Sequence, residues 1–143
     1  MSTGAASIRL RELAALGLVT PPEAYGAGYT VNRYHPLLRQ WKVFLNTWDL
    51  MPVVRRVAAK ARRIVLFGSA AWGADDEESD LDVFVETTVP QTIGSLFPEQ
   101  IRGRPLQVLI CTPEQAADIR KNNRPLWANI SRGVVLWDEV EPW

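Results

Sequence analysis

The sequence predicts an α/β fold of the α+β kind, a β-sheet flanked by helices, and three segments carry this prediction. Residues 63–67, RIVLF, form an almost wholly apolar run, which is typical of a strand buried on both faces. Residues 80–86, DLDVFVE, alternate, so that Asp80 and Asp82 share one face of a strand and Leu81 and Val83 the other. Residues 106–110, LQVLI, predict a third strand.

The remaining elements follow from local signals in chain order. Residues 7–16 contain good helix formers and end before a glycine, and residues 18–32 hold two short β-prone runs around a Pro- and Gly-bearing loop, which predicts a helix and a hairpin. Residues 36–60 predict two helices joined near 49–52, because Pro52 disfavours helix in the residue before it. Thr112 is the expected N-cap of a helix that starts at Pro113. Residues 133–137 are either a final strand or a packed tail.

Composition narrows the class of protein. The chain has 143 residues, which suits one compact domain, or one domain with a small appendage. The chain has a single cysteine, Cys111, and a single histidine, His35. It therefore cannot form a disulfide within itself, and we do not expect a zinc site of His/Cys type. No apolar run reaches the roughly 18 residues that a membrane-spanning helix needs, and no signal peptide is recognisable at the start. We therefore expect a cytoplasmic protein without membrane contact.

The net charge is zero, but the charge is unevenly distributed along the chain. Residues 1–63 contain ten Lys and Arg against three Asp and Glu, whereas residues 64–143 contain six against thirteen. The basic half could meet nucleic acid. It could equally meet the acidic half of its own chain or of a partner.

The chemistry is concentrated in residues 64–86, IVLFGSAAWGADDEESDLDVFVE. Gly68 and Ser69 follow a buried strand and precede a short helix, a place where glycine allows a sharp turn and where free N–H groups can meet a phosphate. Asp80 and Asp82 project from one face of the next strand, and two carboxylates this close repel each other unless a cation lies between them. Hard oxygen ligands of this kind suit Mg²⁺, which usually also takes phosphate oxygens.

This stretch resembles the signature of the DNA polymerase beta-like nucleotidyltransferases, especially the minimal ones of bacteria and archaea. The signature runs Gly-Ser, a glycine a few residues later, and then Ser-Asp-x-Asp, and the chain supplies its six residues in order: Gly68, Ser69, Gly73, Ser79, Asp80 and Asp82. The resemblance implies a nucleotidyltransferase fold with a mixed sheet. It also implies that Gly68, Ser69, Gly73 and Ser79 belong to a nucleoside triphosphate site, and that Asp80 and Asp82 are catalytic residues that bind Mg²⁺.

One departure from the family pattern concerns the third carboxylate, which the family usually carries on the next strand. Here the natural counterpart is Gln107, which cannot supply a negative charge. Glu86 shares the face of Asp82 but lies roughly 13 Å further along the strand, which makes it a poor substitute. Nucleotide binding is then expected to survive while transfer is weak or absent.

The residues around the signature have simpler interpretations. Residues 75–78, DDEE, are expected to form a solvated loop. Trp72 is expected to pack over the turn, with stacking on a base as the alternative. Asp80 and Asp82 alone could be two solvated carboxylates; the other four signature residues favour a site.

The N-terminal segment resembles the second half of a winged helix-turn-helix. A helix that ends in Leu-x-x-x-Gly-Leu-Val and a hairpin that closes near Tyr-x-x-Asn match residues 13–19 and 29–32. The resemblance implies that Arg9 and Arg11 face the groove or the phosphates of DNA. The helices that precede the recognition helix in that fold are not found in residues 1–6, so we also expect this segment to pack against a second copy as a homodimer.

These observations divide the chain into a partial winged-helix segment (1–35), linking helices (36–62) and a nucleotidyltransferase domain (63–143). Three functions remain open. The first is transfer of a nucleoside monophosphate from a nucleoside triphosphate to an acceptor, with Mg²⁺. The second is a catalytically weak, nucleotide-binding or antitoxin-like regulatory protein with a protein partner. The third is a winged-helix DNA-binding regulator.

Overall fold

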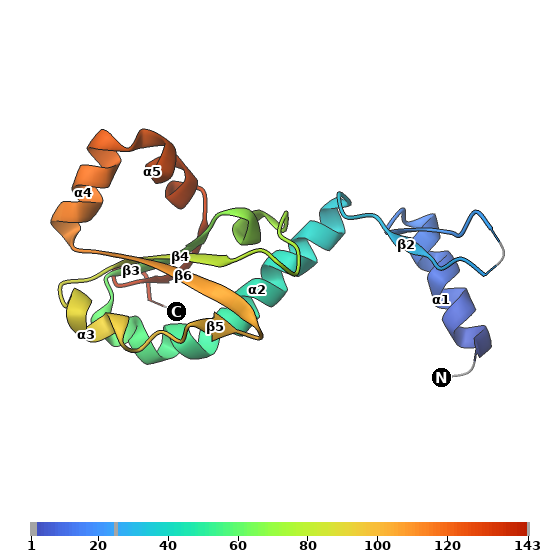
Figure 1. Ribbon diagram of the computed structural model, residues 1–143, viewed down its shortest axis with the longest axis horizontal. Coiled ribbons are helices and arrows are strands. Elements are labelled where there is room, and N and C mark those ends of the chain that lie inside the picture. Colours follow the sequence, from blue (N-terminus) through green and yellow to red (C-terminus); the bar gives the residue numbers. More distant parts are fainter. Residues whose placement is uncertain (1–2, 25, 143) are drawn as a thin grey trace.

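The computed structural model describes residues 3–24 and 26–142, which form a body around a mixed sheet and an arm that stands away from it (Figure 1). The elements follow in this order: α1 (Thr3–Ala15), β1 (Val19–Thr20), β2 (Thr30–Val31), α2 (Pro36–Val57), η1 (Ala58–Lys60), β3 (Arg63–Phe67), η2 (Ser69–Trp72), β4 (Leu81–Glu86), α3 (Pro90–Gly94), β5 (Gln100–Ile101), β6 (Arg104–Cys111), α4 (Pro113–Asn122), α5 (Arg124–Ser131) and β7 (Val134–Asp138). No described helix is long and apolar enough to cross a membrane.

The sheet of the body has five strands in the order β5-β6-β4-β3-β7. β4 and β6 run parallel, whereas β3 is antiparallel to both β4 and β7, and β5 is antiparallel to β6. The predicted mixed sheet is thus confirmed. Residues 133–137, whose sequence left two readings open, form most of the edge strand β7.

Two helical layers cover the sheet, and the alternation of β4 explains how. Leu81, Val83 and Val85 point to the face that α2 and α3 cover, where they join Leu50 and Val54 of α2 in one buried cluster. Phe84 points to the other face, under α4 and α5, and meets Trp127 of α5 edge to face at 6.2 Å between ring centroids. Asp82 shares the face of Phe84, because side chains two residues apart lie on the same side of a strand.

The prediction of two helices with a joint near Pro52 is wrong, because α2 continues through this residue. It is one helix of 22 residues with Pro52 inside it. A proline in a helix interior loses one backbone hydrogen bond and crowds the preceding turn. Here the buried side chains continue on both sides of it, from Asn46 and Leu50 to Val53, Val54 and Val57. Their burial against the sheet holds the chain helical through Pro52.

The helix predicted after Pro113 is confirmed, together with its cap. Thr112 accepts a hydrogen bond from the Gln115 amide at 3.3 Å, and the Gln115 side chain accepts one from the Thr112 amide at 2.9 Å. This capping box satisfies two backbone donors that would otherwise lack partners.

The arm consists of α1 and the β1–β2 hairpin, as predicted, with α1 starting four residues earlier than residue 7. Gly17 adopts φ +74°, and the amides of Gly17 and Leu18 donate to the carbonyls of Ala14 and Leu13, a Schellman ending that favours glycine. Asn32 ties the end of the hairpin to this turn, since its side-chain amide donates to the Gly17 carbonyl at 3.0 Å.

Candidate functional site

The predicted phosphate turn lies in direct contact with Asp82, one of the two predicted metal carboxylates. Gly68, at the end of β3, adopts φ +70° and ψ −160°, a conformation that essentially only glycine adopts. A Cβ atom at Gly68 would lie 2.3 Å from Oδ2 of Asp82. The glycine therefore allows two things at once, the sharp turn into η2 and the close approach of the Asp82 carboxylate. Ser69, the next residue, is exposed.

Asp82 lies in β4 opposite Phe67 of β3, and Asp80 directly precedes the strand. The strand thus begins one residue later than predicted, at Leu81. Partial burial, and secondly the negative charge of Asp80, raise the pKa of the Asp82 carboxyl above its usual range. Both effects disfavour the charged form of Asp82, and a cation bound between the two carboxylates would relieve them.

Gln107 occupies the position that the sequence indicated for the missing carboxylate. It lies on β6 in parallel register with Asp82, and its side chain is exposed. Glu86 lies at the far end of β4, opposite Arg63, so it is remote from Asp82 along the strand. Within residues 3–24 and 26–142, no group of three or more His, Cys, Asp or Glu side chains is arranged to hold a metal ion.

Comparison with known proteins identifies the family of the chain. The family model of the nucleotidyltransferase domain matches residues 53–126, which is more than half of the chain and includes the turn, both aspartates and Gln107. This chain belongs to the nucleotidyltransferase domain family. No curated protein sequence matches it.

A solved structure described as a putative nucleotidyltransferase from Sulfolobus solfataricus is similar to this nucleotidyltransferase domain in fold. The match has a TM-score of 0.50 and covers 84% of this chain and 97% of the other, at 11% sequence identity. At that identity the similarity concerns the fold alone. The mixed sheet flanked by helices is the fold that the sequence predicted.

Gly73 and Ser79, the other two signature residues, make contacts within the protein. Gly73 has φ +63°, and a Cβ atom there would lie 2.2 Å from the backbone oxygen of Arg39, so it lets η2 pack directly on α2. The Ser79 hydroxyl donates to the Asp76 carboxylate at 2.7 Å and accepts from the Asp76 amide at 3.0 Å. The hydroxyl lowers the pKa of the Asp76 carboxyl. Ser79 thereby closes the loop that leads to Asp80.

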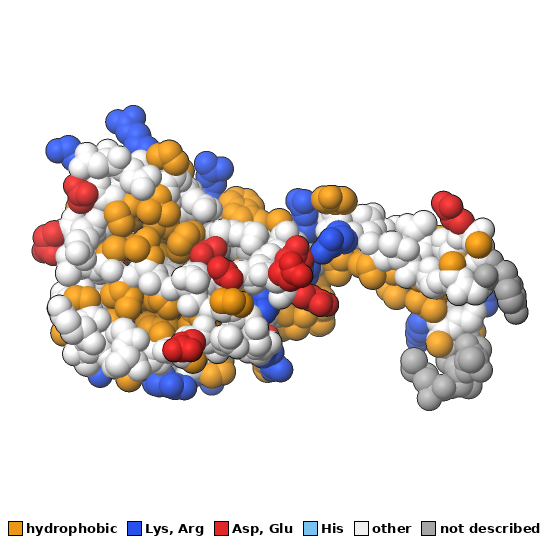
Figure 2. All heavy atoms as spheres, viewed as in Figure 1, with side chains coloured by type: hydrophobic (Ala, Val, Ile, Leu, Met, Phe, Trp, Pro, Cys, Tyr) orange, Lys and Arg blue, Asp and Glu red, His pale blue; other side chains and the backbone are white. Residues whose placement is uncertain are grey.

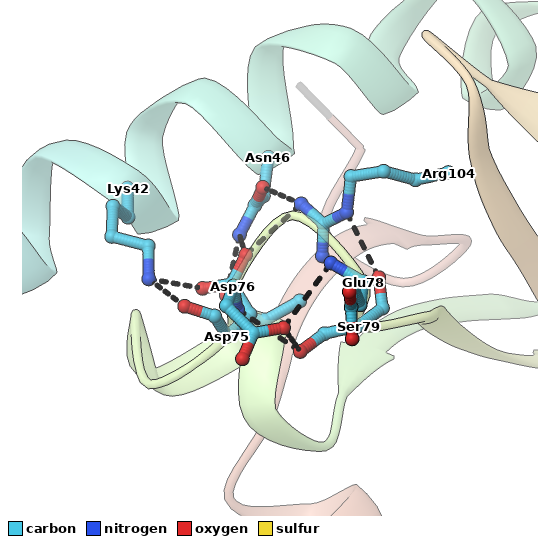
Figure 3. Close-up of polar contacts among 8 residues, drawn as sticks. Lys42, Asn46, Asp75, Asp76, Glu78, Ser79 and Arg104 are labelled. Carbon is cyan, nitrogen blue, oxygen red and sulfur yellow. Dashed lines mark hydrogen bonds and ion pairs between the residues drawn. The ribbon is translucent and has the colours of Figure 1, made fainter.

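The structure corrects the prediction for Asp75. Residues 75–78 were expected to form a solvated loop, but the side chain of Asp75 is buried. The residue is 4% exposed, whereas residues 76–78 are exposed as predicted. Its carboxylate lies 3.2 Å from Nζ of Lys42 and 3.0 Å from a guanidinium nitrogen of Arg104 (Figure 3). Asn46 donates to it at 3.1 Å. Two cations and an amide therefore compensate the desolvation of this carboxylate.

The cluster of Lys42, Asn46, Asp75 and Arg104 connects three parts of the site, as Figure 3 shows. Lys42 also donates to the backbone oxygen of Asp75, and Asn46 donates to the backbone oxygen of Ala70 in η2 at 3.0 Å. Arg104 donates to the Asn46 side chain and, at 2.9 Å, to the backbone oxygen of Ser79. Arg104 of β6 thus binds the backbone of Ser79, the residue directly before Asp80, and Asn46 of α2 binds the backbone of η2.

A cavity of about 880 Å³ borders the same cluster on the side of the arm. Its lining includes Arg33, Lys42, Asp75, Glu78 and Arg104. Gly68, Ser69, Asp80 and Asp82 do not line it. The turn and the two aspartates are the candidate site, because the Asp82 carboxylate lies directly beside Gly68 there.

The side chain of Trp72 is 47% exposed beside the turn. Packing within the chain therefore covers only part of the surface of the indole. No local pattern in the sequence indicated the cluster around Asp75, because its four members come from three separate segments.

Proposed function

We propose that this nucleotidyltransferase domain binds a nucleoside triphosphate with Mg²⁺ and transfers the nucleoside monophosphate to an acceptor, with release of pyrophosphate. The observation that carries the proposal is the contact between Gly68 and the Asp82 carboxylate. It brings the turn that would receive the phosphates next to the carboxylates that would receive the metal. Ser69, exposed beside this turn, would donate its hydroxyl to a phosphate oxygen.

The residues present fit a divalent cation in part. Asp80 and Asp82 offer hard oxygen ligands, and burial, followed by the charge of Asp80, raises the pKa of the Asp82 carboxyl, an effect that a bound cation would oppose. Mg²⁺, when bound, would neutralise charge on the phosphates during in-line transfer. The role of the chain is to orient the triphosphate on the Gly68–Ser69 turn and to hold the Asp82 carboxylate beside that turn.

Calorimetry with each of the four common nucleoside triphosphates, with and without Mg²⁺, tests this proposal. We expect affinity to rise when Mg²⁺ is added, because two carboxylates alone dehydrate Mg²⁺ poorly and phosphate oxygens complete its shell. The Asp80→Asn/Asp82→Asn double variant should lose that rise. Ser69→Ala should weaken binding by only about 1 kcal/mol, the net value of one hydrogen bond. Binding that ignores both Mg²⁺ and the double substitution would refute a metal site here.

A second candidate, a catalytically weak nucleotide-binding or regulatory protein with a protein partner, is favoured by one observation. Gln107 stands in register with Asp82 on the neighbouring strand, where the family usually carries an acid. The metal that activates the acceptor would then lack a ligand, whereas the residues proposed to receive the triphosphate, Gly68 and Ser69, are present. Nucleotide binding without measurable transfer to any acceptor distinguishes this candidate from the first.

The arm supports a third role, DNA binding by a winged-helix segment with Arg9 and Arg11 toward the duplex and with a second copy beside it. Both arginines are exposed on α1, where Arg9 pairs with Glu12 at 2.7 Å. Binding to duplex DNA should weaken steeply with salt, and further when both arginines become Ala. Salt-insensitive or absent binding would exclude this role.

A further inference from the structure

The N-terminal half of α2 exposes an apolar stripe of five residues on the surface between the body and the arm. The stripe consists of Leu37, Trp41, Phe44, Leu45 and Trp48, and their side chains are between 40% and 63% exposed. Figure 2 shows hydrophobic side chains gathered along the lower edge of the segment that joins the body to the arm. Monomeric proteins rarely expose a contiguous apolar patch of this kind without an interaction partner.

The stripe lies on the side of α2 that faces away from the sheet. At about 100° per residue, Trp41, Phe44 and Trp48 fall within one narrow sector. Asn46, Leu50, Val53 and Val57, which are buried against the body, fall on the opposite side of the helix. A surface helix is expected to be polar opposite its buried face, so a second apolar face predicts a second contact.

The aromatic side chains of the stripe are already ordered by contacts with one another. The rings of Trp41 and Phe44 stack with centroids 5.5 Å apart, and those of Phe44 and Trp48 lie 6.1 Å apart. A surface whose large side chains are held in place loses little conformational entropy when a partner docks on it.

We propose that the stripe is a homodimer interface, in which α2 of a second copy packs antiparallel on α2 across a two-fold axis. The spacing of Leu37, Trp41, Phe44 and Trp48 alternates between four and three residues, the spacing of a helix–helix seam. The stripe is also nearly symmetric about a point between Phe44 and Leu45. With the axis at that point, Trp41 of one copy meets Trp48 of the other, and each copy presents the same surface.

The lack of charge among the exposed residues of the stripe favours a second copy over a nucleic acid. From residue 37 to residue 48, the α2 residues classed as exposed are Leu37, Gln40, Trp41, Phe44, Leu45 and Trp48, and none of them is charged. Near a two-fold axis a residue faces its own copy, so any charge there would meet a like charge. A nucleic-acid surface, by contrast, would carry Lys or Arg among these residues.

The apolar area of the stripe suits a weak dimer. Large apolar side chains bury roughly 150–250 Å² each when fully covered, so five half-exposed ones supply on the order of 500 Å² per copy. Two copies then reach at most on the order of 1,000 Å², which is below the roughly 1,200–2,000 Å² of stable interfaces and in the range of weak ones, so the arm would have to add to the contact. Ile8 and Leu16 of the arm, 52% and 59% exposed, offer further apolar area.

Sedimentation velocity of the full chain over a concentration series tests the proposal, independently of nucleotide chemistry. We expect a dimer at micromolar concentration, and at least a 100-fold weaker association for Phe44→Asp, because two carboxylates would meet near the axis. Val140→Asp is the matched control, an apolar-to-acidic change at a residue that is 81% exposed outside the stripe, and it should leave the dimer intact.

A cross-link keeps the proposal testable if Phe44→Asp fails to fold. Leu45→Cys lies beside the expected axis, whereas the natural cysteine, Cys111, is buried. Under mild oxidation we expect a covalent dimer of Leu45→Cys that thiol reduction reverses, and none for Val140→Cys. A wild-type chain that stays monomeric at high concentration, that binds lipid vesicles as a monomer, or whose dimer survives Phe44→Asp would overturn the proposal.

Discussion

At the residue scale, the site depends most on Gly68. Both its backbone conformation and the space at its Cα exclude a side chain, because a Cβ atom would lie 2.3 Å from the Asp82 carboxylate. The sequence indicated this glycine from its place after a buried strand. It could not indicate the contact with Asp82, which depends on the antiparallel pairing of Phe67 with Asp82.

Gly68→Ala should therefore lower stability by about 1–3 kcal/mol through backbone strain. It should also displace the Asp82 carboxylate and so abolish the Mg²⁺-dependent rise in nucleotide affinity. Denaturant unfolding and calorimetry measure the two effects. Gly103→Ala is the matched control: Gly103 has φ +82°, but no atom lies within 4 Å of its added Cβ. It should show the strain alone, and wild-type-like nucleotide affinity of Gly68→Ala would contradict the assigned geometry.

At the scale of elements, the sequence predicted what local patterns determine. The apolar run of β3, the alternation of β4 and the capping residues of α4 each depend on neighbours within a few positions, and all three elements are confirmed. α2 was predicted wrongly because Pro52 is a local signal for a break, whereas the burial that keeps the helix continuous is a long-range effect.

Asp75 was missed for the same physical reason. An acidic run such as DDEE is typical of a solvated loop, and the partners that bury its first residue are distant in sequence, at Lys42, Asn46 and Arg104. Local composition carries no information about such partners. The buried cluster became visible only when α2, the loop and β6 were seen together.

Asp75→Asn should destabilise the protein by about 3–5 kcal/mol, because it leaves Lys42 and Arg104 charged without their shared counterion. The loop that leads to Asp80 should loosen as well, since Arg104 holds the backbone oxygen of Ser79. Denaturant unfolding gives the free energy, and amide hydrogen exchange of residues 76–80 reports on the loop. Glu77→Gln, at an exposed position of the same loop, is the control and should change little. Equal stability of the two variants would count against the cluster.

At the scale of the whole molecule, the candidate site is assembled from three adjacent strands of the sheet. β3 ends in the turn, β4 carries Asp82, and β6 carries Gln107 beside it. The order of these strands could not be derived from their sequences, and the family resemblance implied only a mixed sheet and a third carboxylate position on the next strand. The departure at Gln107 could be recognised in the sequence, and the parallel register shows where it falls: the residue beside Asp82 on the neighbouring strand carries no charge.

Gln107→Asp should restore that charge. Gln107 is exposed, so the change is expected to be compatible with the fold, and a carboxylate beside Asp82 would complete a set of three acids for a second metal ion. Titration of Mn²⁺ in the presence of a non-hydrolysable nucleoside triphosphate, followed by electron paramagnetic resonance, counts bound ions. We expect one ion per chain for the wild type and two for the variant, together with a higher transfer rate. Gln100→Asp, an exposed position on the edge strand β5, should keep the wild-type count. If Gln107→Asp also binds a single ion, then Gln107 does not occupy the position of the missing ligand, and the weak transfer expected of this chain needs another cause.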